Sequence, residues 1–148
     1  MTVQTNATTQ LGIVAATPAT HNEAGFAALT FVNVGEVVSI GEHGGSAALV
    51  THSPLATRAV SKFKGSINYG SMPVAFGLDI TDAGQVLLDA GALGASIDVD
   101  HSVKITYQDA SVEYFQAKIM SYTRNPSTID AIISGNSTFE LVTSIIDA

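Results

Sequence analysis

Histidines and closely spaced aspartates are the residues of this 148-residue chain whose types could support chemistry. The histidines are His21, His43, His52 and His101. Their spacings match no metal-binding motif, such as two histidines one helical turn apart. His43 and His52 flank Gly44-Gly45 and could meet across a hairpin, but a zinc site would need two further ligands. His101 lies on an apolar strand face, which is typical of a core or interface histidine. No metal site is therefore predicted.

Asp98 and Asp100 are the best candidates for an acid–base pair, because both lie on one face of an expected strand. Such a pair works only where burial separates the two pKa values. Their neighbours Ser102 and Lys104 look solvated, and nothing nearby indicates a pocket. There is also no nucleophile elbow and no phosphate-binding glycine loop. We expect no catalytic residue, no cofactor and no enzymatic activity.

The segment from Lys62 to Leu93 is expected to organise the rest of the fold. Its pattern predicts a strand, a tight turn, a second strand and a helix. Apolar and polar residues alternate strictly from Ser71 to Ile80, which predicts a half-buried strand. In the preceding strand, Phe63, Ile67 and Tyr69 alternate with Lys62, Lys64, Ser66 and Asn68. Gly70 can supply the positive φ of a hairpin turn between the two strands.

A helix is expected over Asp82–Leu93. Asp82 can cap its N-terminus with Gln85 as the capping-box partner, and Gly91 or Gly94 can end it. Apolar residues follow at helical spacing, so the helix is expected to pack on the sheet as a lid.

Other segments add further strands, with loops at 17–28, 41–46 and 53–60. The expected strands are Leu11–Ala16, Leu29–Ile40 broken by Gly35, Ala47–His52, Ile97–Tyr107, Val112–Thr123 and a final segment, Ile129–Ile146, interrupted or bent near Gly135. Val112–Thr123 has apolar residues on both faces, so it is expected to be covered on both sides. The prediction is one mainly β domain over residues 1–148, with a flexible N-terminal arm over about residues 1–10. It would be a β-sandwich or partly closed barrel of about seven to eight strands with one flanking α-helix.

Composition favours an assembling protein over a nucleic-acid binder. Only 13% of residues are charged, a low share that suggests a surface covered by neighbours. The net charge of −7 disfavours tight binding to phosphates. The chain has no cysteine, no expected signal peptide and no apolar stretch as long as a membrane span.

Several short motifs, in this order, resemble the major tail tube proteins of long-tailed bacteriophages. They are Val34-Gly35-Glu36-Val37, Gly44-Gly45, Val50-Thr51-His52-Ser53-Pro54-Leu55, Lys64-Gly65, Tyr69-Gly70, Asp82-Ala83-Gly84-Gln85 and Met120-Ser121-Tyr122-Thr123-Arg124-Asn125-Pro126. The resemblance implies a β-sandwich with a flanking helix, whose hexameric rings stack into a hollow tube that conducts the viral genome. It also implies tape-measure, tail-tip and terminator proteins as partners, and a place in the virion tail after assembly in the host bacterial cytoplasm.

Two other functions remain open. One is the inner tube of a contractile injection or secretion system. The other is a monomeric β-sandwich module that binds a ligand such as carbohydrate, although the chain has no Trp for stacking on sugar rings.

Three groups of residues are candidates for assembly roles. The basic anchors for acids of a neighbouring subunit are Arg58, Lys62 and Lys64, which share a face of an extended run; the alternative is a solvated strand face. The ring-stacking candidates are His43, Gly44, Gly45, Pro54, Leu55 and Arg58. The lumen-facing candidates are Asp98, Asp100, Ser102, Asp130, Ser134, Asn136, Thr138 and Glu140. An acidic or polar wall repels phosphates and lets DNA slide, but these acids could instead keep the particle soluble.

Overall fold

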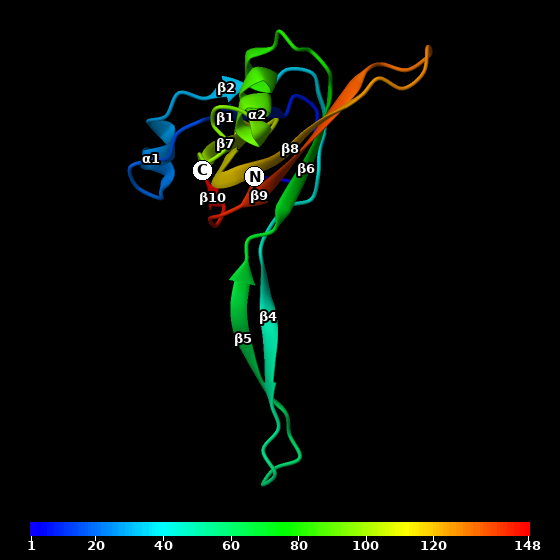
Figure 1. Ribbon diagram of the computed structural model, residues 1–148. Coiled ribbons are helices and arrows are strands. Elements are labelled where there is room, and N and C mark those ends of the chain that lie inside the picture. Colours follow the sequence, from blue (N-terminus) through cyan, green and yellow to red (C-terminus); the bar gives the residue numbers. More distant parts are fainter.

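An eight-stranded antiparallel sheet with a helix packed against it organises the chain, and a long two-stranded ribbon projects from it (Figure 1). The computed structural model describes all 148 residues, Met1 to Ala148. The main sheet has the order β2-β1-β7-β8-β9-β6-β3, with β10 beside β8, and the ribbon is β4-β5. Neighbouring strands of both sheets pair antiparallel. The mainly β fold with one flanking helix is confirmed, and the sheet does not close into a barrel.

The elements follow one another along the chain with short connections. They are β1 (Gln10–Val14), α1 (Glu23–Ala27), β2 (Val32–Asn33), β3 (Val37–Ile40), β4 (Ser46–His52), β5 (Ser61–Asn68), β6 (Ser71–Gly77), α2 (Ala83–Leu93), β7 (His101–Thr106), β8 (Val112–Asn125), β9 (Ser134–Leu141) and β10 (Ile146–Asp147). Neither helix is long and apolar enough to cross a membrane.

Helix α2 covers the apolar face of the sheet, as predicted. Leu88 and Ala92 are buried in one hydrophobic cluster with Phe76, Phe115 and Phe139 of the sheet. Burial of such large side chains is the main favourable term in folding. The cluster therefore fixes the helix against the strands that carry the candidate surfaces.

The start of α2 follows the predicted cap, with one correction. The Asp82 carboxylate accepts a hydrogen bond from the backbone N–H of Gln85 at 3.0 Å. The Gln85 side chain does not complete a capping box. It is fully buried, and its amide donates to the backbone carbonyls of Gly35 and Gly77. Gln85 therefore ties the helix to the turn before β3 and to the end of β6.

The predicted hairpin at Gly70 is wrong. Gly70 does have a positive φ of 88°, but β5 pairs with β4 while β6 pairs with β3 and β9. Gly70 is thus the point where the chain leaves the ribbon and enters the main sheet. Gly70 does have the predicted turn conformation, but the predicted pairing of β5 with β6 is wrong.

The prediction that β8 is covered on both faces holds only for its first half, since Met120 in the second half is 55% exposed. Phe115 lies in the core, while the ring of Tyr114 stacks on Phe26 of α1 with centroids 5.4 Å apart. The final segment predicted as extended over Ile129–Ile146 is interrupted near Gly135, as expected, because residues 129–133 form a loop and β9 begins at Ser134. A second interruption lies between β9 and β10.

The strand predicted over Ile97–Tyr107 is shorter than expected. Residues 97–100 form turns and an irregular segment, and β7 begins at His101. Asp98 and Asp100 therefore do not share a strand face.

Candidate assembly surfaces

The β4-β5 ribbon is the most exposed part of the molecule. Every residue of both strands is exposed, and the ribbon points away from the body of the protein (Figure 1). A two-stranded ribbon is marginally stable in water when nothing covers either face. Its exposed apolar side chains make it the leading candidate for a contact surface.

A β-bulge changes which side chains share a face of the ribbon. Ala47 pairs with Ile67 and Leu49 pairs with Lys64, so β5 has one residue more than β4 between these pairs. Side chains alternate along a strand, and one extra residue moves every later side chain to the other face. Ile67 therefore lies beside Lys64. The prediction that Ile67 shares a face with Phe63 is wrong.

We name the two faces by their charge. The lysine face contains Ala47, Leu49, Thr51, Lys62, Lys64 and Ile67. The uncharged face contains Ala48, Val50, His52, Ser61 and Phe63. A Cβ on Gly65 would lie 2.9 Å from Cγ2 of Val50, which places Gly65 on the uncharged face too.

Charge is strongly segregated between the ribbon and the body. Residues 46–68 carry three basic residues, Arg58, Lys62 and Lys64, and no acid. The remainder carries all thirteen acids and three basic residues, a net charge of −10. Arg58 lies in the tip loop with Pro54 and Leu55, outside β5, so the prediction that it shares the strand face of both lysines is wrong.

The root of the ribbon holds the other ring-stacking candidates, His43, Gly44 and Gly45. The two connections pass very close there, since a Cβ on Gly70 would lie 2.2 Å from the Gly44 carbonyl oxygen. Gly44 itself has a φ of 146°, in the region that favours glycine. These glycines shape the junction between ribbon and sheet.

His43 clamps this root to β8. Its Nε2 lies 2.9 Å from a carboxylate oxygen of Glu113, and its Nδ1 lies 3.0 Å from the carbonyl oxygen of Gly41. Both partners accept, so a protonated His43 ring can donate one hydrogen bond from each of its nitrogens. The hydrogen bond to Glu113 raises the pKa of His43 and lowers the pKa of Glu113. Burial, with Glu113 as a second cause, raises the pKa of nearby Tyr107.

The other histidines do not join His43. His52 lies in β4 opposite Ser61, near the tip of the ribbon, so His43 and His52 do not meet across a hairpin. His101 is fully buried, its Nδ1 lies 3.0 Å from the Val99 carbonyl oxygen, and burial lowers its pKa. His21 contacts the Ser144 hydroxyl. The structure contains no group of three or more side chains that could hold a metal ion.

A polar face on β9 contains four of the lumen-facing candidates. Ser134, Asn136, Thr138 and Glu140 alternate with buried residues, so all four side chains lie on one face. Asp130 is exposed in the loop between β8 and β9. This polar face continues onto β8, where Lys118 lies opposite Glu140 in the sheet.

The other lumen-facing candidates, Asp98, Asp100 and Ser102, do not share one exposed surface. Asp98 is exposed in a turn, and Asp100 forms an ion pair with Lys118. Ser102 is fully buried, and its hydroxyl donates to the Ala16 carbonyl at 2.6 Å. Its prediction as a solvated, lumen-facing residue is therefore wrong.

An apolar cavity of about 390 Å³ lies between the end of α2 and β8. We call it the α2 groove. It is lined by Ala92, Leu93, Ile97, Asp98, Lys118, Ile119 and Met120. Sequence reasoning missed it, because exposed apolar side chains at a helix end look like core residues until the packing is known.

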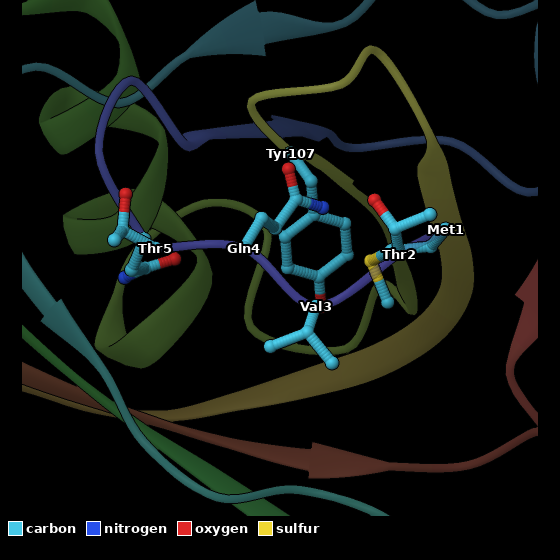
Figure 2. Close-up of a pocket in the computed structure, with 7 residues that line it drawn as sticks. Met1, Thr2, Val3, Gln4, Thr5 and Tyr107 are labelled. Carbon is cyan, nitrogen blue, oxygen red and sulfur yellow. The ribbon is translucent and has the colours of Figure 1, made fainter.

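The N-terminal arm crosses over the ring of Tyr107 and borders an open space of about 430 Å³ (Figure 2). The arm has no regular secondary structure before β1, yet it contacts the turn after β7. The Gln4 side chain accepts from the backbone N–H of Asp109 at 3.1 Å, and Thr5 bonds Gln108. Because the arm supplies most of the walls, this space is a gap beneath a strap of chain.

Solved structures show which known proteins share this architecture. The sequence matches no protein-family profile and no curated protein. Its structure is similar to a chain of the native gene transfer agent virion, with a TM-score of 0.66, 9% identity and 99% of each chain covered. A chain of the tail of the empty gene transfer agent particle, described with C6 symmetry, gives a TM-score of 0.66 at 10% identity over 97% of each chain.

The chain has the tail-tube fold. It also matches a structure described as the sheath/tube terminator of an extracellular contractile injection system, with a TM-score of 0.66, 10% identity and coverage of 100% of this chain and 98% of that chain. Likeness at such low identity shows a shared fold, and the tail-tube resemblance of the sequence is confirmed at that level.

Proposed function

We propose that this chain is a structural subunit of a phage-type tail tube, built from hexameric rings that stack into a hollow conduit for genome delivery. The observation that carries the proposal is a ribbon exposed along both strands, on a chain whose fold matches tail components over nearly its full length. Covering the ribbon with a neighbouring copy would bury its apolar side chains. The six-fold symmetry named for a similar tail supports a hexameric ring.

In this proposal the ribbon makes the contacts between stacked rings. The tip loop with Pro54, Leu55 and Arg58 reaches furthest from the body, and the root is held by His43. The basic ribbon of one copy would meet the acidic body of another, which carries a net charge of −10. Opposite charges steer association and fix register.

The polar face of β9 is the proposed lumen wall. It exposes hydroxyl and amide groups and Glu140, with no basic residue on β9 itself. Lys118 of β8 borders this face but is paired with Asp100, so the face offers no free cation for tight binding of DNA phosphates, which requires lysine or arginine and release of counterions. Asp130 of the neighbouring loop is a further candidate. The proposal places the protein in a virion tail, with tape-measure and tail-tip proteins as partners, after assembly in the host cytoplasm.

A tube terminator is the second candidate function, because the match to a sheath/tube terminator covers both chains almost completely. An inner tube of a contractile system is a variant of the first proposal, supported by a sheath-tube complex with a TM-score of 0.58. A terminator would form single rings, whereas a tube subunit would form polymers.

Assembly of the purified chain tests the proposal. We expect size-exclusion chromatography and negative-stain microscopy to show rings and tubes at high protein concentration. A matched variant, with residues 47–67 replaced by a short Gly-Ser turn, should keep the circular dichroism of the body and remain monomeric. A wild-type chain that stays monomeric at high concentration and is absent from intact tails would refute the proposal. Single rings without tubes would favour the terminator.

A further inference from the structure

We propose that the lysine face of the ribbon docks in the α2 groove of a second copy of this chain. This inference rests on the proposed function and adds to it the two surfaces that meet. A second copy is the partner, because the groove and the ribbon are complementary in both apolar character and charge.

The ribbon side combines apolar and basic groups on one face. Leu49 is 67% exposed and Ile67 is 64% exposed, and they lie beside Lys62 and Lys64. The bulge creates this combination, since without it Ile67 would share the opposite face with Phe63. The uncharged face has no lysine or arginine, and His52 is the only residue on it that could present a positive charge to an acidic partner.

The groove combines apolar and acidic groups. Leu93 and Met120 expose 83% and 55% of their surfaces, and Ile97 lies next to them. Lys118 at the rim is already paired with Asp100, whereas Asp98 has no cation within ion-pair distance. The groove therefore offers apolar surface beside one unpaired carboxylate, which is the complement of the lysine face.

The contact must form between copies. The ribbon projects away from the body that carries α2, so a ribbon cannot fold back onto its own groove (Figure 1). The two surfaces are different, and each copy has both, which makes the contact heterologous. A heterologous contact repeats from copy to copy and builds rings or filaments.

Engineered cysteines give a direct test, because the chain has no cysteine of its own. In the double variant Ile67→Cys/Leu93→Cys, mild oxidation of assembled protein should produce a ladder of covalent oligomers on a non-reducing gel. The matched control is Phe63→Cys/Leu93→Cys, which moves the ribbon cysteine to the uncharged face. We expect at least a several-fold weaker ladder from this control.

Exchange of charges gives an independent test. Lys64→Glu and Asp98→Lys should each raise the protein concentration needed for assembly by a few-fold, up to about tenfold, and the double variant should restore it. All these side chains are exposed, so the thermal melting of the monomer should match the wild type. A stronger ladder from the Phe63 variant, or no restoration by the charge exchange while the wild type still forms tubes, would overturn the inference and leave the proposed function standing. A wild type that never assembles would overturn both.

Discussion

Removing the charge of Glu113 tests whether an ion pair holds the ribbon root. In Glu113→Gln the shape is kept, but the carboxylate that accepts from His43 at 2.9 Å is lost. A hydrogen bond to a charged group contributes about 1.5–3 kcal/mol. The His43 and Glu113 side chains are only 12% and 15% exposed, so solvent screens the pair weakly. We expect a loss of about 2 kcal/mol, or about 4–8 °C in melting temperature, where both groups are ionised.

The pH dependence of this loss follows from the two pKa shifts. The pKa of His43 is raised from 6.5, so its contribution is complete below pH 6.5 and is lost as pH rises through the raised value. The pKa of Glu113 is lowered from 4.5, so its contribution is complete above pH 4.5 and is lost as pH falls through the lowered value. The full effect is expected between pH 4.5 and 6.5. At pH 9 the loss should be smaller, because a neutral His43 can donate only one N–H and no longer forms an ion pair with Glu113.

Urea unfolding of the monomer at both pH values measures the effect. Hydrogen exchange of residues 41–46 should show faster opening in the variant at pH 5.8, since the ribbon root would be released. Glu42→Gln is the matched control: it makes the same change of charge at an exposed neighbouring residue without an ion-pair partner. Equal destabilisation by Glu113→Gln at pH 5.8 and pH 9, or a loss no larger than that of the control, would refute the clamp.

Three further changes test other parts of the structure. Phe139→Ala removes a fully buried ring and should cost about 3–5 kcal/mol of monomer stability, whereas Phe63→Ala on the exposed ribbon should cost less than about 0.5 kcal/mol; urea unfolding that ranks the two alike would contradict the assigned core. Gly84→Ala should destabilise by about 1–3 kcal/mol despite the better helix propensity of Ala, because its Cβ would lie 2.4 Å from the Asn33 carbonyl oxygen; a thermal melt at or above the wild-type value would show that the strand can move. Asn136→Lys/Thr138→Lys should leave tubes intact and slow DNA ejection, more so at low salt, and unchanged ejection kinetics would remove β9 from the lumen wall.

The sequence by itself determined the features that depend on neighbours in the chain. The cap at Asp82 and the spacing that follows it predicted α2, because a helix is built from contacts three and four residues apart. Strict alternation predicted β6, and apolar residues on both faces predicted the two-sided burial of β8 around Phe115. The basic group on the ribbon was also visible, since charge can be counted along the chain.

Only the tertiary structure decided what depends on partners far away in sequence. Gly70 carries the same turn signal whether its flanking strands pair with each other or with β4 and β9. The bulge that moves Ile67 beside Lys64 is a property of two paired strands, so no single-strand pattern contains it. His43 and Glu113 meet across 70 residues, and the buried Ser102 hydroxyl donates to the carbonyl of Ala16, 86 residues away. Partner choice among strands is set by the packing of the whole core, and that is why these contacts could not be predicted from local patterns.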